Sequence, residues 1–262
     1  MLRVWRAAML AVLLASCGSA NLQPTVAPSA PLSSVDVVAA TPSPSPTLSP
    51  YPVFTVDPGT TAAAGEIRVI QVVVRTWASF GEVRAVLIAE VTNMGTVTAD
   101  IEHGEHHWSI PAASRAVLAA GTYMSATDRI LAPGQTGYLW TEVVLPGKRL
   151  PELGTALVEP DWKDVDVDTR RAQVDRIHWR RAPYSDGLIA TGRVTNKTED
   201  ELAVAQVAIV FLDKGGRPLG IITDSSARTL PPGASAGWQT DSSSPPISAK
   251  DVGSIQVFTI VQ

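Results

Sequence analysis

Three of the four histidines in the chain fall between residues 102 and 107. If that segment is a β-strand, His103, Glu105 and His107 point to the same face, because alternate side chains of a strand share a face. Two imidazoles and a carboxylate in that arrangement could bind Zn²⁺ or Cu²⁺ together with a further ligand. The sequence therefore predicts His103, Glu105 and His107 as a candidate metal site.

A second interpretation of this histidine segment is an exposed strand or hairpin tip that tolerates polar side chains. No distant motif with regular ligand spacing accompanies it. Asp164, Asp166 and Asp168 alternate with valines, but they lack the glycine and the distal glutamate of a calcium loop, so a solvated edge strand is the better interpretation. We predict no cofactor, and a metal-binding or sensing role is the alternative function.

The only cysteine, Cys17, closes an N-terminal segment with a basic start and an apolar run at residues 7–14. This is the three-part layout of a secretory signal, predicted at residues 1–16. The apolar run is shorter than the roughly 20 residues that a transmembrane helix needs. An ordinary signal peptide or a short membrane anchor is the alternative interpretation. A single cysteine excludes a disulfide within the chain.

Residues 14–17, Leu-Ala-Ser-Cys, resemble the lipobox of bacterial lipoproteins. The resemblance implies that the thiol of Cys17 is lipidated and that cleavage makes Cys17 the new N-terminus. Each buried CH₂ of an acyl chain contributes about 0.8 kcal/mol, so two or three chains would anchor the protein stably. We expect a location on the cell membrane, outside the cytoplasm.

Residues 17–65 are predicted to form a lipid anchor followed by a disordered linker. Ser, Pro, Thr and Ala dominate this stretch, most clearly at residues 41–50. Such a composition cannot bury enough apolar surface to offset the entropy of ordering it. The short apolar runs at residues 36–38 and 53–56 lie among prolines and are not assigned. A glycosylated stalk is the alternative.

From residue 66 onward, β-branched runs separated by Gly and Pro turns predict an all-β fold. The pattern indicates two tandem antiparallel β-sandwich domains at residues 66–160 and 173–262, joined by a link at 161–172. Strands are expected at 67–77, 87–92, 97–103, 105–110, 129–131, 137–144 and 155–159, and again at 174–180, 188–195, 202–212, 219–222, 228–230, 236–240 and 255–261.

The second half of the sequence repeats the first. Val-Thr-Asn at residues 91–93 returns at 194–196, and Pro133-Gly134 returns as Pro232-Gly233. Each Pro-Gly pair is followed, after the same interval, by a similar closing segment at 153–158 and 252–257. Asn196 also begins a glycosylation sequon, for which an ordinary turn is the preferred interpretation.

The second copy resembles the FxLYD-type domain, an immunoglobulin-like module of bacterial surface lipoproteins. The residues that carry the resemblance are Gly192, Val194, Asn196, Asp213, Gly215, Gly216, Leu230, Pro232, Gly233 and Trp238. The signature itself is altered, with Ile209, Phe211 and Leu212 at its place, and the first copy departs further. The resemblance implies an immunoglobulin-like fold and an envelope location, and the family has no catalytic residues to carry over.

Seven tryptophans accompany only four phenylalanines. Those in or beside expected strands are predicted to be core residues, because each buries a large area: Trp77, Trp108, Trp140, Trp179 and Trp238. Trp140 is also a candidate binding residue for a carbohydrate or protein. Trp162 lies in the link, where it could act as a wedge between the domains.

The charge balance bears on partners. Lys and Arg total 21 and Asp and Glu 25, a net charge of −4, which is a poor match for nucleic acid. The sequence has no Gly-rich phosphate loop and no catalytic cysteine, so we predict that the protein is not an enzyme. The predicted function is a non-catalytic, lipid-anchored envelope protein that acts as a binding or spacer module for a protein or glycan partner. A specific role is expected in the divergent first copy.

Overall fold

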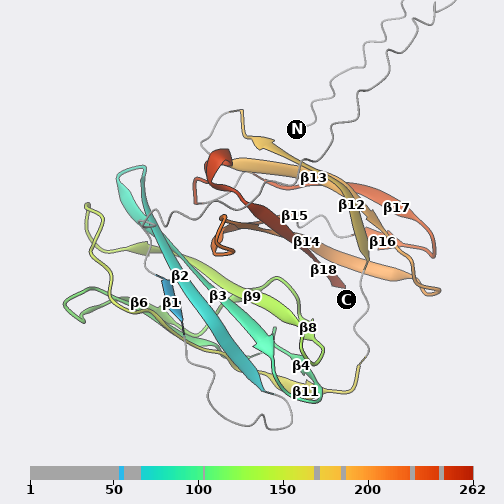
Figure 1. Cartoon of the computed structure of the whole chain (residues 1–262), viewed down its shortest axis with the longest axis horizontal. Helices are drawn as coiled ribbons and strands as arrows, with labels where there is room; N and C mark the ends of the chain where they lie inside the picture. Colours follow the sequence, from blue (N-terminus) through green and yellow to red (C-terminus); the bar gives the residue numbers. More distant parts are fainter. Residues whose placement is uncertain are drawn as a thin grey trace, which may run out of the picture. The chain divides into compact units, whose positions relative to one another are not determined.

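The computed structural model describes residues 53–55, 66–102, 104–167, 172–183, 187–224, 228–241 and 245–261. This described part is all-β and antiparallel, with one 3-10 turn, η1 (Ala249–Asp251), and no α-helix. Cys17 and most of the predicted linker lie outside the described residues. Figure 1 shows the strands from β1 to β11 and those from β12 to β18 as two groups, here called the first and second modules.

The first module is built on a five-stranded sheet with the order β1-β2-β3-β9-β7. Its strands are β1 (Val53–Thr55), β2 (Ile67–Ser79), β3 (Glu82–Asn93), β9 (Thr136–Leu145) and β7 (Ser125–Ala126). Two three-stranded sheets accompany it: β10 (Leu157–Glu159), β5 (His107–Pro111) and β6 (Val117–Gly121) form one, and β11 (Lys163–Val165), β4 (Thr98–Asp100) and β8 (Ile130–Leu131) form the other.

The core of the first module lies between the large sheet and the two small ones. Leu87 of β3 and Leu139 of β9 pack in one cluster with Trp108 of β5, Leu131 of β8 and Val158 of β10. Burial of these side chains is the main stabilising contribution, at roughly 25 cal/mol per Å² of apolar surface. The immunoglobulin-like tandem arrangement stays a prediction.

The second module repeats this plan with fewer strands. One sheet has the order β12 (Gln173–Arg181), β13 (Leu188–Thr195), β17 (Ser235–Gln239). The other is centred on β14 (Leu202–Leu212), which pairs with β15 (Pro218–Asp224), β16 (Arg228–Leu230) and β18 (Ser254–Val261). Val207, Ile209 and Phe211 of β14 pack against Leu188 and Trp238 of the first sheet in a second core.

The same hydrogen-bond network closes both modules around a buried asparagine. Asn93 Nδ2 donates to the carbonyls of Val97 and Leu131, each at 2.8 Å, and Asn93 Oδ1 accepts the N–H of Gly95 at 2.9 Å. The peptide N–H of Gly134, which has φ +75°, donates to the Asn93 carbonyl. A positive φ is a conformation that glycine adopts without strain, which explains the Pro-Gly turn.

In the second module Asn196 makes the matching bonds. Its Nδ2 donates to the carbonyls of Asp200 and Leu230 at 2.7 and 2.8 Å, and its Oδ1 accepts the N–H of Thr198 at 2.9 Å. The N–H of Gly233 donates to the Asn196 carbonyl. The repeat detected in the sequence is therefore a repeat of contacts, and Asn196 Nδ2 is held inside the fold, as the turn interpretation of its sequon requires.

A third hydrophobic cluster joins the modules. Alternation along β3 and β14 turns Ile88 and Val210 away from the two cores and towards one another, in a cluster with Tyr138 and Phe258. The Tyr138 and Phe258 rings meet edge to face, with centroids 5.8 Å apart. Both β3 and β14 are therefore buried on two faces, and the chain from Leu48 onward forms one compact unit.

The expected strands agree best with the second module, where β13, β14 and β16 have the predicted bounds. Two predictions were wrong in the first module. β3 begins at Glu82 rather than at residue 87, whereas β1 forms in the run at residues 53–56 that was not assigned. Residues 97–110 do not form two adjacent strands, since β4 and β5 belong to different sheets. In addition β11, from the predicted link, pairs with β4, and its exposed Asp164 agrees with a solvated edge strand.

Candidate functional site

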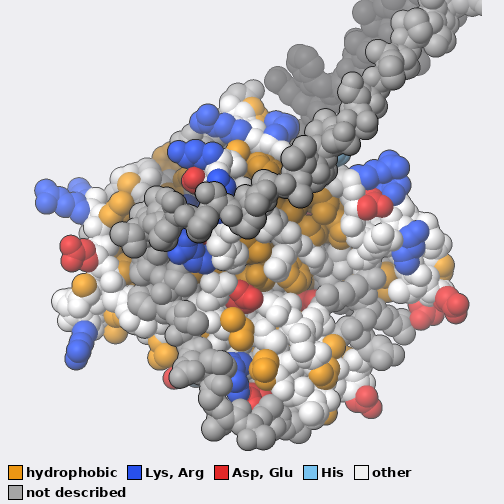
Figure 2. All heavy atoms as spheres, in the orientation of Figure 1, with side chains coloured by type: hydrophobic (Ala, Val, Ile, Leu, Met, Phe, Trp, Pro, Cys, Tyr) orange, Lys and Arg blue, Asp and Glu red, His pale blue; other side chains and the backbone are white. Residues whose placement is uncertain are grey.

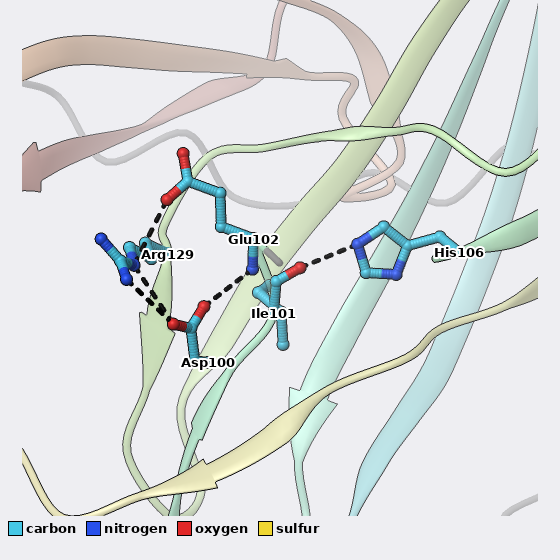
Figure 3. Close-up of polar contacts among 5 residues, drawn as sticks. All are labelled: Asp100, Ile101, Glu102, His106 and Arg129. Atoms are coloured by element: carbon cyan, nitrogen blue, oxygen red, sulfur yellow. Dashed lines mark hydrogen bonds and ion pairs between the residues drawn. The ribbon is translucent and has the colours of Figure 1, made fainter. Parts of the chain in front are cut away.

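The histidine segment is a loop, not a strand, between β4 and β5. Its buried side chain is His106, whose Nε2 is 2.8 Å from the carbonyl oxygen of Ile101, as Figure 3 shows. On the other side, His106 Nδ1 accepts the N–H of Asp161 at 3.1 Å. These two partners assign the neutral tautomer with the proton on Nε2, because Nδ1 must be the acceptor.

Burial lowers the pKa of His106 below its ordinary value, while the Ile101 carbonyl and the nearby Asp161 carboxylate oppose that shift. Because desolvation disfavours the charged ring, His106 is neutral at physiological pH. A neutral, fully hydrogen-bonded imidazole with no exposure to solvent closes a loop and is not placed to bind a substrate. His106 is therefore a structural residue.

The rest of the loop is fastened in the same way. Asp100 Oδ1 accepts the N–H of Glu102 at 3.0 Å, and its Oδ2 accepts from Arg129 Nε and Nη2 at 3.2 and 3.1 Å (Figure 3). Glu102 Oε2 adds a second ion pair to Arg129 at 3.3 Å. A Cβ on Gly104 would lie 2.5 Å from the Asp161 carbonyl oxygen, so the backbones meet closely there.

The structure does not place Glu105 and His107, the two described members of the predicted metal site, on the face of one strand. His103 lies outside the described residues, Glu105 is an exposed loop residue, and His107 is exposed at the start of β5. Within the described ranges, no group of three His, Cys, Asp or Glu side chains is placed to hold a metal ion. The strand on which the prediction depended is wrong, and no observation supports the metal-binding alternative.

The tryptophans divide between the cores and the contact of the modules. Trp108 and Trp238 are buried in the two cores, as predicted. Trp77 and Trp140 are partly buried against the cluster that joins the modules. The core prediction is wrong for Trp179, which is 36% exposed although its ring meets Phe211 edge to face at 6.1 Å.

Trp140 and Trp162 both differ from their predicted surroundings. Trp140 stands on the face of β9 that carries Tyr138 and contacts the second module, so its assignment as a partner contact stays a prediction. Trp162 packs against the core of the first module and is not in the cluster that joins the modules. The prediction of a Trp162 wedge is therefore wrong.

A cavity of about 560 Å³ lies at the junction of the modules. It is lined by Arg75, Arg181, Leu188, Pro246, Ile247, Ser248, Ala249 and Asp251. Arg75, from β2, is buried, and its guanidinium donates to the carbonyl of Leu219 and to that of Pro246, the latter at 3.5 Å. Two guanidinium groups and one carboxylate line this cavity together with apolar side chains.

Sequence reasoning missed this cavity. The sequence did hold one signal, since Arg75 directly follows the valines at residues 72–74. A charged side chain in a buried strand needs a partner. That partner lies in the second module, about 140 residues further along the chain. The junction cavity is the described feature best suited to a ligand, since ligand pockets commonly lie between domains.

Residues 233–237 have the Gly-x-Ser-x-Gly spacing of a serine nucleophile, a further candidate for chemistry. Ser235 begins β17, and its hydroxyl is 2.8 Å from that of Thr195, across the pair of strands. A nucleophile elbow needs a strand, a sharp turn and a helix. The described part has no α-helix there, and Ser235 stands in a strand ladder, so its local geometry differs from that of a nucleophile elbow.

Side chains of both charges are scattered over the face drawn in Figure 2, with hydrophobic side chains between them. No helix in the described ranges is long and apolar enough to span a membrane. No protein-family model matches the chain, and comparison with curated proteins finds no match either. The FxLYD and lipoprotein resemblances therefore stay predictions.

Proposed function

We propose that this chain is a non-catalytic, lipid-anchored protein of the bacterial cell envelope. In this proposal Cys17 carries the lipid, and the two modules stand outside the cytoplasm as a binding or spacer element for a protein or glycan partner. Nucleic acid is not a partner. The FxLYD-type assignment belongs to the same proposal and is supported by the shared network of Asn93 and Asn196.

The observation that carries the proposal is the packing of the two modules against each other. Tyr138 is buried in the joining cluster, and burial raises the pKa of its hydroxyl well above the ordinary value, with the Glu90 carboxylate adding to the effect and a hydrogen bond to the Gln256 side chain opposing it. A contact with a buried aromatic centre holds two modules in one orientation. A pair of modules held in this way can present loops from both to one partner.

The junction cavity is the place where we expect that partner to bind. Arg75 and Arg181 both line it, and Arg181 is exposed to solvent. A guanidinium binds a carboxylate with two parallel hydrogen bonds, so the chemistry favours a partner with a carboxylate, such as an acidic glycan or an acidic peptide side chain. Asp251 would limit the total negative charge that the cavity accepts.

The anchor is tested by growing cells with an alkyne fatty acid. The wild-type chain should take up the label and sediment with membranes, and the Cys17→Ser variant should lose the label. Label on the Cys17→Ser chain, or none on the wild type, would contradict the anchor.

Binding at the cavity is tested by crosslinking in intact envelopes with an Arg181→Ala variant. Arg180→Ala is the matched control, because Arg180 is an exposed neighbour on β12 that does not line the cavity. Arg181→Ala should reduce a specific crosslink by at least about tenfold, which corresponds to roughly 1.4 kcal/mol, while Arg180→Ala leaves it unchanged. Equal yields from both variants would remove the cavity from the proposal.

A further inference from the structure

The turn between β2 and β3 carries an aromatic side chain that the described fold does not use. Phe80 is fully exposed and has φ +51°, and Gly81 follows with φ +81°. Two positive φ values are what a two-residue hairpin turn requires, and Asn or Gly usually fills the first position. A bulky aromatic residue in the left-handed region is an outlier, and outliers of this kind gather at functional positions.

Other exposed hydrophobic side chains lie at the same end of the first module. Val83 pairs with Leu145, so the end of β9 and the loop that follows it lie beside the turn (Figure 1). Val144 and Leu150, on this strand end and loop, are 52% and 56% exposed. We call this end of the first module the tip end and define it as Phe80, Val144 and Leu150 together with the two cations of the loop, Lys148 and Arg149. The tip end presents three separate apolar side chains to solvent.

The loop after β9 adds charge to these apolar groups. Lys148 and Arg149 are exposed there, and Glu152 is its acidic side chain. Glu82 and Glu142 are both paired with Arg84, at 3.4 and 3.0 Å. Apolar side chains bordered by cations are the composition of segments that settle in the interface of an anionic membrane.

The direction of β1 follows from its pairing with β2. β1 runs antiparallel to β2, with Val53 opposite Val73 and Thr55 opposite Gln71. Val53 is therefore nearer to the tip end than Thr55, and β1 runs away from the end of the sheet that carries Phe80.

We propose that the tip end of the first module docks on the anionic surface of the membrane that holds the lipid anchor. Phe80 enters the interface between headgroups and acyl chains, Val144 and Leu150 border it, and Lys148 and Arg149 contact anionic headgroups. The proposal rests on the lipid-anchored function above. It sets the orientation of the module pair, because one end of the first module then faces the membrane.

The test uses the full chain reconstituted in phosphatidylcholine vesicles with and without phosphatidylglycerol. A Ser79→Cys variant is labelled with an environment-sensitive NBD dye, next to Phe80. The thiol of Cys17 is blocked in the acylated chain, and the mass of the labelled chain reports acylation and labelling together. Lys214→Cys is the control, because Lys214 is exposed at the hairpin turn after β14 in the second module.

With phosphatidylglycerol present, emission of the Ser79→Cys label should shift to the blue and be quenched by spin-labelled lipid. The Lys214→Cys label should show neither effect. Phe80→Asn in the Ser79→Cys background should abolish the shift without lowering the urea midpoint, since Asn tolerates a positive φ better than Phe does. Loss of the shift is then separated from unfolding.

Each other outcome decides a different point. An acylated chain without a shift at Ser79→Cys overturns the docking and leaves the anchor intact. A chain that is not acylated refutes the anchor, and with it the docking on a membrane that holds the anchor. A shift of equal size at Lys214→Cys, or one that does not depend on phosphatidylglycerol or on Phe80, overturns the docking.

Discussion

The two modules share one network but differ at a cross-strand pair close to it. In the first module Ala89 of β3 faces Leu139 of β9, and at the matching place in the second module Gly192 of β13 faces Trp238 of β17. Each pair therefore combines a large side chain with a small residue, and the larger of the two large side chains, Trp238, faces the smaller of the two small residues, Gly192. A Cβ on Gly192 would lie 2.3 Å from Cζ2 of Trp238, so the indole ring occupies the space that a side chain would need.

This comparison separates what the fold requires from what each copy has adjusted. The bonds from the side-chain amides of Asn93 and Asn196 to two carbonyls recur in both modules, because each amide satisfies carbonyls that the turns would otherwise leave without a donor. The opposed pair can vary as long as its summed volume is kept, since cores tolerate swaps that conserve volume. Breaking the asparagine network should therefore lower the free energy of unfolding by the same amount in both modules. Changes to the cross-strand pair should have different effects in the two modules.

Replacing the network asparagine should give the largest loss. Asn93→Ala and Asn196→Ala should each lower the free energy of unfolding by roughly 3 kcal/mol, because two carbonyls lose their donor inside the protein. Urea unfolding followed by tryptophan fluorescence measures both. The equivalence of the modules requires costs within about 1 kcal/mol of each other, and a neutral Asn93→Ala would show that the first copy no longer depends on the network.

The opposed pair should give the next effect. Gly192→Ala should cost about 2 kcal/mol through overpacking against Trp238, and the reverse change, Ala89→Gly, should cost about 1 kcal/mol through backbone entropy and a lost methyl. The double variant Gly192→Ala, Trp238→Leu reproduces the pair of the first module. It should be less destabilised than the sum of its single changes in a double-mutant cycle, and additivity would mean that the two residues do not compensate.

The strand pattern of the second module could be predicted because its turns are marked locally, by Gly215-Gly216 and Pro232-Gly233. Residues 97–110 could not be predicted in this way. Asp100 accepts the N–H of Glu102, and His106 closes on Ile101, so polar side chains bind nearby backbone and compete with strand pairing.

The contact of the modules left only a weak signal in the sequence. The apolar runs at residues 85–89 and 207–212 do not alternate with polar residues, which is typical of strands buried on both faces. The faces that pack against each other belong to strands more than 100 residues apart in the sequence. The junction cavity and the contacts of Arg75 were therefore found only in the structure. The candidate metal site depended on one strand through residues 103–107, but Glu105 lies in the loop before β5 and only His107 lies in the strand, while His103 is outside the described residues.

His106 distinguishes the modules by pH, because the described part of the second module has no buried histidine. The folded-state pKa of His106 is lowered by burial, so the unfolded chain binds its proton more readily. Its contribution to stability is complete above the unfolded pKa of about 6.5 and is lost as pH falls from there towards the folded-state pKa. Urea midpoints of the wild type should drop across this window, and His106→Gln should remove that part of the slope.

The smallest effect is expected at a polar pair that occupies one register position in both modules. Gln71 Nε2 donates to Glu90 in the first, and Arg193 donates to Asp175 at 2.8 and 2.7 Å in the second. The Arg193 guanidinium lowers the pKa of Asp175, and in turn the Asp175 carboxylate raises the pKa of Arg193.

Because the folded-state pKa of Asp175 is depressed, its stabilisation is present above the unfolded pKa of about 3.9 and is lost as pH falls through the folded value. Arg193→Gln should therefore lower the urea midpoint slightly at neutral pH, less in high salt, and not at all once Asp175 is protonated. The pair of Gln71 and Glu90 in the first module supplies the reference, because only one of its members is charged. The effect of Gln71→Ala on the urea midpoint should therefore not depend on salt. If it does, the charge of Glu90 interacts with more than Gln71, and the two positions are not equivalent.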